Sequence, residues 1–480
     1  MLPSKYNKIL GEFSDLLTSG EKVVFKTLQL YRSLELYKVK IKVPEAPQGV
    51  YNKTDILLLM LLYPLFCLSN VYQYSASNYK GILEASKNTF YRFKNNSLIP
   101  WRSILYSVFG KLNNQIREKG SEDIDSPRCL IIDDTDLCKT GKHIEHAGMI
   151  WSHTLQRSIL GFKGLFLGLW DSKSFMALDF SLHKEKGQNS KKPFGLKRQE
   201  LKLQYHKSRP DKSAARRREE ELLTSKIDNV ISLLRRAIAN RVSFEYVLMD
   251  SWFVCEKIIR FVIGTGTHVV GMVKMGKTTY MFNGRKRSAK EIAVLLKRNG
   301  KVRRLKRLHL YVTEAVVDMK GIPVKLFFFK QAQRGKWNVL LSTNTGLSAT
   351  KAYEIYTIRW SIEVYFKEAK TYFGLGKSQS RDFDAQIADI SISMVQYNLF
   401  SLAKRFTSYE TLGALFNETR ETMIELTICK RLWGFIQELL ALLADIFELD
   451  LEVVMSRIIE MPEKENRLLK IIQKSALTAA

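Results

Sequence analysis

One stretch of the chain places a single carboxylate among cations and a phenol at helical spacing. Five residues share one face of a predicted helix, within an arc of roughly 80° at about 100° per residue: Tyr356, Arg359, Glu363, Lys367 and Lys370. The neighbouring arc is apolar and predicts a side that faces a core: Ile355, Ile358, Ile362, Phe366 and Ala369. Ser348 or Thr350 can cap the start of this helix, and Gly374 can end it. The carboxylate can hold a metal ion and the cations suit phosphate oxygens, whereas the alternative is a solvated charged face.

Two short apolar runs upstream end in aspartate. Cys129–Asp133 is followed by Asp134-Thr135-Asp136, and Tyr246–Met249 is followed by Asp250. Each run predicts a buried strand with an acid at its carboxyl end, where open α/β sheets place their sites. Two strand-end aspartates and a helix glutamate can converge on a pair of divalent metals, an arrangement that serves in-line phosphoryl chemistry. For any single aspartate, a turn or a helix cap is the alternative role.

On the helix residues, the chain resembles the DDE transposases of the insertion-sequence-four family. That family carries Tyr, two residues, Arg, three residues, Glu, six residues and Lys, which is the spacing of Tyr356, Arg359, Glu363 and Lys370. Trp360, directly after Arg359, also fits the family. The resemblance covers residues from about 125 to about 405.

The resemblance also selects the aspartates. The family's first aspartate usually precedes Thr or Ser, which favours Asp134 over Asp133 and Asp136. The second ends an apolar strand, which favours Asp250. The resemblance therefore implies that Asp134, Asp250 and Glu363 are catalytic and bind two Mg²⁺ ions, with Mn²⁺ as a substitute. It implies DNA contacts from the remaining cations and the phenol of the helix face: Tyr356, Arg359, Lys367 and Lys370.

The function implied by the resemblance is cut-and-paste DNA transposition, with end cleavage through a hairpin and strand transfer. Its partners would be double-stranded DNA, as terminal inverted repeats and target, and a second copy of the chain in a homodimer on DNA. The protein would be cytoplasmic in a bacterium and held at the nucleoid through DNA. Two alternatives stay open: a non-catalytic DNA-binding protein, against which the intact acids count, and a structure-selective nuclease without strand transfer.

Composition agrees with a polyanionic partner. The chain has 480 residues, a net charge of +28 and 45% hydrophobic residues, which predicts a globular protein of two or three domains. A membrane surface is the rival partner, but the longest apolar run, Ile56–Leu68, is too short to span a bilayer and predicts a core helix. The five cysteines are scattered, as in a cytosolic protein with reduced thiols.

The fold class implied is α/β, a ribonuclease-H-like core interrupted by an antiparallel β-insertion and flanked by helical regions. Strands at Cys129–Asp133, Gly161–Trp170 and Phe175–Leu182 form a meander before helix and strand alternate. Alternating residues, as in Leu308–Thr313, predict the insertion. The expected divisions are a helical region at 1–115 that is expected to bind DNA, core at 125–274, insertion at 275–345, core at 346–405 and a helical region at 406–480.

Several further segments are candidates for DNA contact. Residues 272–307 hold 13 Lys and Arg and one acid, which favours phosphate contacts by residues such as Arg298, Arg303 and Arg304 over mere solubility. Residues 84–96 predict the second helix of a helix-turn-helix unit, or else a helix packed on the core. Trp252 and Trp360 can stack on an exposed base, although core packing is the usual role of Trp.

Two other patterns carry little weight. Gly271–Thr278 fits a phosphate loop, but an apolar strand runs through Gly271 and strand-like residues follow Thr278, so the required helix is not predicted. His143 and His146 have ligand-like spacing without a second pair to complete four ligands, and His153 is a third loop histidine nearby. These histidines are interpreted as polar loop residues.

Overall fold

A computed structural model of the chain describes residues 53–421, apart from positions 78–79, 81–84, 121–125, 188 and 277. The expected helical region at 1–115 is described only from residue 53 on, and most of the expected helical region at 406–480 lies outside the described residues. In the part that is described, no helix is long and apolar enough to cross a membrane.

The core is a sheet with the strand order β4-β3-β1-β5-β6. Its strands are β1 (Cys129–Cys138), β3 (Arg157–Trp170), β4 (Phe175–His183), β5 (Tyr246–Met249) and β6 (His268–Val273). The first three are antiparallel neighbours, and β1, β5 and β6 are parallel. This is the order of a ribonuclease-H-like fold, and the predicted fold class is confirmed. A strand that was not predicted, β2 (Gly148–Ser152), pairs with the start of β3.

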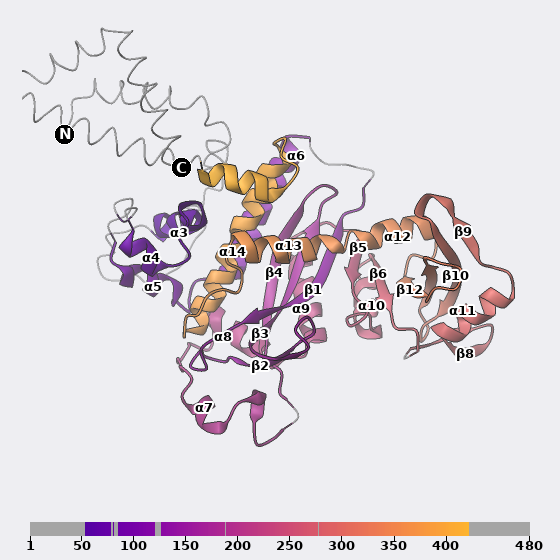
Figure 1. The fold of residues 1–480 in the computed structure, drawn as a ribbon, viewed down its shortest axis with the longest axis horizontal. Helices are drawn as coiled ribbons and strands as arrows, with labels where there is room; N and C mark the ends of the chain where they lie inside the picture. The colour runs from indigo at the N-terminus through magenta and orange to yellow at the C-terminus, as the bar shows by residue number, and fades with distance from the viewer. Residues whose placement is uncertain are drawn as a thin grey trace, which may run out of the picture.

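The middle of the sheet is buried on both faces. Residues 129–132 of β1 and all of β5 are buried, because helices cover the sheet from either side. Helix α9 (Lys226–Ala239) contacts β3 and β4, and α13 (Trp360–Tyr372) contacts β1 and β4 across the front of the sheet in Figure 1. The long helix α14 (Phe383–Arg405) is buried along most of its length and packs on β4.

The predicted insertion extends the same sheet. Strand β12 (Asn338–Ser342), near the end of the expected insertion, pairs antiparallel with β6. Beyond it lie β11 (Pro323–Lys330), β10 (Leu310–Asp318), β9 (Arg303–Leu305), β7 (Thr279–Phe282) and β8 (Arg285–Ser288). The insertion projects to one end of the molecule (Figure 1). It also holds a helix that was not predicted, α11 (Ala289–Arg298), whose start is a capping box between Ser288 and Glu291.

The predicted helix that carries Arg359 and Glu363, called the signature helix below, is divided in the structure. It consists of α12 (Ala349–Thr357) and α13, joined at Ile358 and Arg359 by backbone bonds that span three residues instead of four. Both junction residues keep right-handed helical angles, so the polar and apolar faces continue across the junction. Ser348 caps the start, as predicted, and Gly374 follows the end with φ +65°. Elsewhere, four residues separate the end of helix α8 (Ala214–Glu221) from the start of α9.

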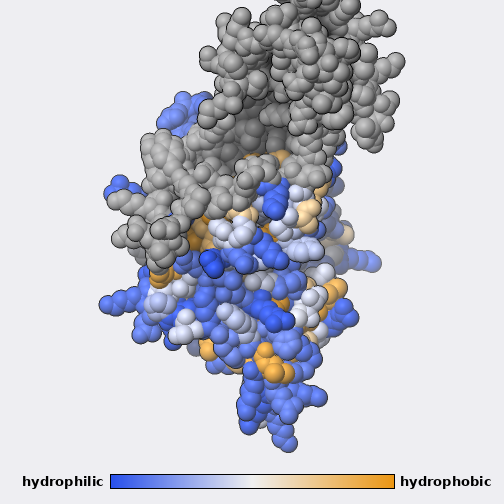
Figure 2. Space-filling view, turned by 90° about the vertical axis from the view of Figure 1, so that its left-hand side faces the viewer, coloured by the Kyte–Doolittle hydropathy of each residue, from blue (hydrophilic) through white to orange (hydrophobic). Residues whose placement is uncertain are grey.

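The remaining elements surround this core. They are α3 (Lys53–Leu62), η3 (Tyr63–Phe66), α4 (Val71–Ala76), α5 (Lys87–Lys94), α6 (Trp101–Glu118), η5 (Pro193–Gly195), α7 (Arg198–Lys202), α10 (Glu256–Ile263) and η6 (Lys306–Leu308). The face on the side of α3–α5 and α7 is mainly hydrophilic, with scattered apolar residues (Figure 2).

Helix α5 is the second helix of the predicted helix-turn-helix unit. Phe90 and Phe93 are buried, and Lys94 forms an ion pair of 2.6 Å with Asp389 of α14. One side of α5 therefore packs on the core, as the alternative interpretation had it. Tyr91 and Arg92 are exposed on the other side, and DNA contact through this helix stays a prediction.

A buried ion network ties the start of α14 to two loops. Arg209 donates to Glu145 at 2.6 and 2.9 Å and to Asp384 at 2.8 Å, and the three side chains are at most 2% exposed. We expect Arg209→Met to lower the free energy of unfolding by about 3–5 kcal/mol, because buried Glu145 loses its guanidinium partner and Asp384 keeps only Lys207. Chemical denaturation measures this loss. The matched control, Lys142→Ala, breaks an exposed ion pair with Glu200 and should change the stability little, because solvent screens the pair.

The same network predicts a pH dependence. Burial would raise the pKa of Glu145, but hydrogen bonds from Arg209 and from the backbone N–H of Phe383 outweigh it and lower that pKa. The stability that Glu145 contributes is therefore present above its unfolded pKa and is lost as the pH falls through its folded pKa. The difference between wild type and Arg209→Met should shrink in acid. A difference that is constant with pH would contradict this account.

Candidate active site

The first group of acids lies within β1 and not at its end. The prediction of a strand-end acid is wrong here, because β1 continues to Cys138 by pairing with β3. The parallel ladder with β5 does stop at Ile132, so Asp133 and Asp134 lie just beyond it. Successive residues of a strand point to opposite faces of the sheet, so these two aspartates face different helices.

Asp133 faces the signature helix. Its carboxylate accepts a hydrogen bond of 2.7 Å from Arg359 Nη1, and Arg359 Nη2 contacts the Glu363 carboxylate. One guanidinium thus bridges an aspartate of β1 and the glutamate of α13. Burial raises the pKa of Asp133 to about 7, against the opposing charge of Arg359, and the nearby carboxylate of Asp250 adds to the rise.

Asp134 faces α9 on the opposite side. Its carboxylate accepts a hydrogen bond of 2.7 Å from Lys226 Nζ, which also lies 4.8 Å from the centre of the Trp252 ring. The sequence selected Asp134 as the first acid, whereas the structure brings Asp133 to the bridge with Glu363.

Asp250 follows β5 directly, as predicted. Its Oδ1 accepts hydrogen bonds from the backbone N–H groups of Trp252 at 2.9 Å and Phe253 at 3.4 Å, which fixes the turn after the strand. Its carboxylate lines a cavity of about 430 Å³ together with both Asp133 and Asp134. The cavity wall also includes His153, Lys163, His183, Lys184, Glu185, Lys226 and Trp252. Burial, aided by the charge of Lys226, lowers the pKa of His183 to about 4, so this imidazole is neutral near pH 7.

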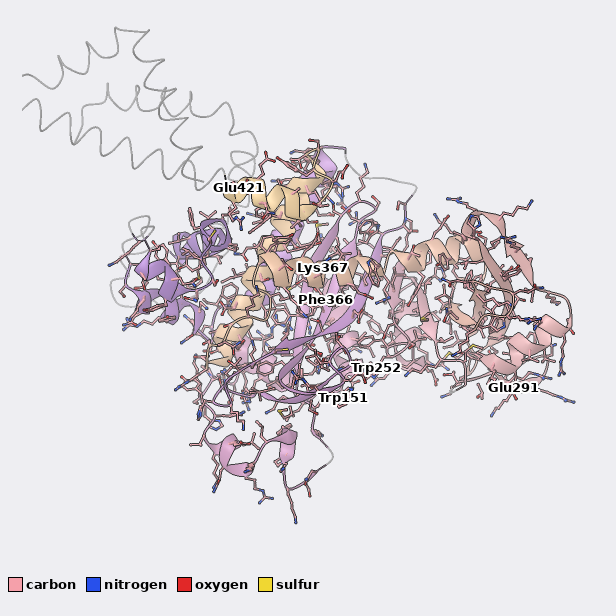
Figure 3. The ribbon with its side chains drawn as sticks, viewed as in Figure 1. Trp151, Trp252, Glu291, Phe366, Lys367 and Glu421 are labelled. Carbon is pink, nitrogen blue, oxygen red and sulfur yellow. The ribbon has the colours of Figure 1, made fainter. Side chains whose placement is uncertain are left out.

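The other predicted residues of the signature helix differ in how far they are buried. Lys370 Nζ donates to the Thr135 hydroxyl at 2.7 Å, and burial lowers its pKa. Tyr356 is half-buried, with its ring centre 5.8 Å from the Arg359 guanidinium, and burial raises its pKa. Lys367 is exposed on the outer side of α13 (Figure 3). Tyr356, Arg359, Glu363 and Lys370 therefore gather against the sheet, and Lys367 does not.

The two predicted stacking residues are exposed and not packed in the core. The side chains of Trp252 and Trp360 are 49% and 62% exposed. Trp252 lines the cavity of about 430 Å³, called the acid cavity below. Sequence reasoning missed Trp151, which is 42% exposed and whose backbone contacts Glu185 and Lys163 of the cavity wall. Both Trp side chains are labelled in Figure 3. No local pattern marks Trp151, because only the pairing of β2 with β3 brings it to this end of the sheet.

The basic run of the insertion is exposed as well. Arg298, Arg303 and Arg304 all face solvent, and Arg303 forms an ion pair of 3.3 Å with Glu314. Glu291, in the same segment, lies far from Trp252 in Figure 3. The run is therefore a surface remote from the acids.

Neither of the patterns given little weight forms a site of the expected kind. Strand β6 runs through Gly271, and the next element, β7, begins at Thr279, so this is not a phosphate loop. His143 Nδ1 lies 2.9 Å from the carbonyl of Leu203. In the described part of the chain, the group whose potential ligand atoms lie within 4.8 Å of one another is Glu145, His146 and Glu219, and Glu145 is bound by Arg209.

The acids fit a hard divalent cation by their chemistry. Asp133, Asp134, Asp250 and Glu363 supply carboxylate oxygens, the ligands that Mg²⁺ and Mn²⁺ prefer. Asp133, Asp134 and Glu363 are now bound by the ammonium or guanidinium groups of Lys226 and Arg359. The carboxylates that bind these side-chain cations also carry the negative charge that a metal ion needs.

Two family models match the chain. Residues 224–399 match the family described as "Transposase DDE domain", and residues 81–306 match the "DDE superfamily endonuclease". The first match includes Asp250 and Glu363, and the second includes both β1 aspartates and Asp250. These matches support a DDE transposase. They do not distinguish the insertion-sequence-four family from other DDE families.

Comparison with curated proteins gave no match. Among solved structures, the chain is similar to one described as a "piggyBac transposase synaptic complex with hairpin DNA", with 12% identity, a TM-score of 0.43, and 85% of this chain and 81% of that chain covered. It is also similar to a Drosophila P element transposase strand transfer complex, with 12% identity, a TM-score of 0.21, and 56% and 55% of the chains covered.

Proposed function

We propose that the protein is a DNA transposase that cuts and joins DNA by metal-dependent phosphoryl transfer. The observation that carries this proposal is the guanidinium bridge between β1 and α13, in which Arg359 contacts both Asp133 and Glu363. Asp250, at the end of β5, is near enough for its charge to raise the pKa of Asp133. In this proposal, Asp133, Asp250 and Glu363 hold the metal ions. Asp134 is the alternative to Asp133, because it lines the same cavity as Asp250 and fits the sequence pattern.

The chemistry divides between the metal site and the basic face. Divalent ions held by the carboxylates would activate the attacking oxygen and stabilise the leaving oxygen. The Arg359 fork can bind two oxygens of a phosphate, and the Lys370 ammonium lies beside the β1 strand at Thr135. These charges would offset the negative charge that develops on the phosphate. The Tyr356 hydroxyl can donate to a neighbouring phosphate oxygen.

The finer parts of the proposal rest on the sequence resemblance. They are cut-and-paste transposition of an insertion sequence through a hairpin, binding of terminal inverted repeats and target DNA, and a homodimer on DNA. The exposed rings of Trp252 and Trp360 suit stacking on an unpaired base, which a hairpin or a nicked end would supply. A bacterial cytoplasmic location, at the nucleoid, belongs to the same proposal.

One incubation tests the proposed activity. The full chain is mixed with Mg²⁺ and with duplex DNA copied from both flanks of its coding sequence, and the products are resolved on denaturing gels. Cleavage followed by joining to a second DNA supports a transposase, and a hairpin product supports the finer mechanism. Cleavage without joining would indicate a nuclease. Binding without cleavage, in either Mg²⁺ or Mn²⁺, would indicate a DNA-binding protein and overturn the proposal.

The basic run of the insertion gives a separate prediction. Changing Lys297, Arg298, Arg303 and Arg304 to Gln should weaken binding to all DNA sequences alike and flatten its salt dependence. Each lost phosphate contact lowers the log–log slope by about 0.9 on duplex DNA. The measurement is affinity over a salt series. A matched control changes four exposed cations of another segment, Lys191, Lys192, Lys197 and Arg198. An unchanged slope in the first variant would mean that this run faces solvent in the complex.

A further inference from the structure

A second charged cluster lies between β4 and the helices α6, α8 and α9. Three guanidinium groups, those of Arg102, Arg218 and Arg236, surround the carboxylates of Asp179 and Glu221. Asp179 is fully buried and Arg218 is 3% exposed. Three cations against two anions leave one buried positive charge in excess. None of these residues belongs to the proposed active site.

Two of the arginines satisfy the carboxylates. Asp179 accepts hydrogen bonds from Arg102 Nε at 2.9 Å and from Arg236 Nε at 2.6 Å. Glu221 accepts from Arg102 Nη2 at 2.9 and 3.0 Å. Burial would raise the pKa of Asp179, but the charges of Arg102, Arg236 and Arg218 outweigh it and hold the pKa at about 2. Both carboxylates therefore have strong partners without Arg218.

Arg218 is the cation in excess. Its Nη1 contacts the carbonyl of Phe180, and its guanidinium lies 4.2 Å from the centre of the Phe180 ring. Its distances to the carboxylates of Asp179 and Glu221 are longer, 3.5 and 3.8 Å. Burial and the neighbouring charge of Arg102 lower the pKa of Arg218 to about 9. A guanidinium held in this way is poorly compensated.

Several buried donors of this cluster have no acceptor among the described residues. They are Arg218 Nη2, Arg236 Nη2, Trp101 Nε1 and Tyr106 Oη. All four residues line one cavity of about 700 Å³. Leaving buried donors unsatisfied is costly, which points to an acceptor that the protein itself does not supply. The acids at the rim do not supply it: Glu220 is exposed, and Asp384 is bound by Arg209 and Lys207.

We propose that this cavity binds a phosphate group. Phosphate oxygens accept several hydrogen bonds, and guanidinium forks match their geometry. The excess positive charge of the arginine cluster attracts the negative charge of the phosphate. The turn between α8 and α9 separates this cavity from the acid cavity, and Thr224 lines both. The phosphate can come from a DNA backbone or from a free anion, and both sources share this chemistry.

The test uses the full chain with inorganic phosphate and pyrophosphate as probes. The thermal midpoint is followed during titration, with chloride at equal ionic strength in parallel. We expect a saturable rise that chloride does not give. Arg218→Met should abolish it, and Tyr106→Phe, which removes only a hydroxyl, should weaken phosphate affinity by about tenfold, as expected for roughly 1.4 kcal/mol. The control Arg216→Gln, on the exposed side of α8, should respond like wild type.

Each other outcome is decisive. No saturable rise in wild type, or an equal rise in Arg218→Met, overturns the proposal. If Arg218→Met fails to fold, Tyr106→Phe and Arg236→Gln still decide it, since an unchanged phosphate affinity in both would mean that the network is purely structural. The titration needs no catalysis, so its failure leaves the proposed transposase function untouched. That function can fail equally without affecting this site.

The source of the phosphate is distinguished with duplex DNA. If the cavity receives a backbone phosphate, Arg218→Met should lower DNA affinity and Arg216→Gln should not. If it receives a free anion, DNA affinity should be equal in both variants while the phosphate response still differs. Either result supports the site and assigns its ligand.

Discussion

Glu363→Gln and Asp250→Asn are each expected to abolish DNA cleavage and leave DNA binding largely intact. Each change removes a charged oxygen ligand from the proposed metal site and keeps the shape of the side chain. The single-turnover rate should fall on the order of a thousandfold or more, and a double variant should be little worse, because the ligands act as a unit. The control is Glu354→Gln on α12, whose carboxylate pairs with Arg307 at 3.1 Å instead. Full cleavage by either variant would contradict the assignment.

The two aspartates of β1 are separated by the same assay. We expect Asp133→Asn to lose cleavage more completely than Asp134→Asn, because Asp133 shares the Arg359 fork with Glu363 and Asp134 is bound by Lys226. The reverse result would show that Asp134 is the ligand, as its position before Thr135 indicates. Full activity in both would mean that β1 does not supply a catalytic acid.

The elements that carry the proposed acids could be predicted from sequence because each depends on a local pattern. An apolar run ending at Met249 predicts a buried strand, and the spacing of Arg359 and Glu363 predicts a shared helix face. The capping box at Ser288 could also have been recognised in the sequence, and it would have predicted α11. The break at Ile358 could not be predicted, because no Gly or Pro marks it and the helical angles persist through it.

The sequence alone does not show which of Asp133 and Asp134 lies on the side of Glu363. Strand alternation shows that the two face opposite sides, but not which side the glutamate helix covers. That side is set by the path of the chain over the 226 residues that separate Asp133 from Arg359. The cluster of Arg102, Arg218 and Arg236 could not be predicted from the sequence either, because its members are distant along the chain. Arg102 lies 77 residues from Asp179 and 119 from Glu221, and no local pattern links them.

Arg359→Lys and Arg359→Ala are expected to slow cleavage by roughly ten- to a thousandfold. Arg359 bridges Asp133 and Glu363. In the proposed site, its charge would offset the negative charge that develops on the reacting phosphate. Lysine keeps the charge but loses the planar fork, so it cannot contact both carboxylates in the same way and should not rescue the rate fully. Lys370→Ala should act in the same direction through the loss of its charge beside Thr135.

The matched control for these variants is Lys367→Ala, on the same helix but exposed to solvent. If Arg359 acts on the reacting phosphate, its variants should lose rate at saturating Mg²⁺ and DNA while their thermal midpoints stay near wild type. The side chain is only 15% exposed, so a structural role is the competing explanation. That explanation predicts a large fall in thermal midpoint, with a rate per folded molecule close to wild type. Measuring midpoint and single-turnover cleavage on the same samples decides between them, because only the catalytic role separates the two quantities.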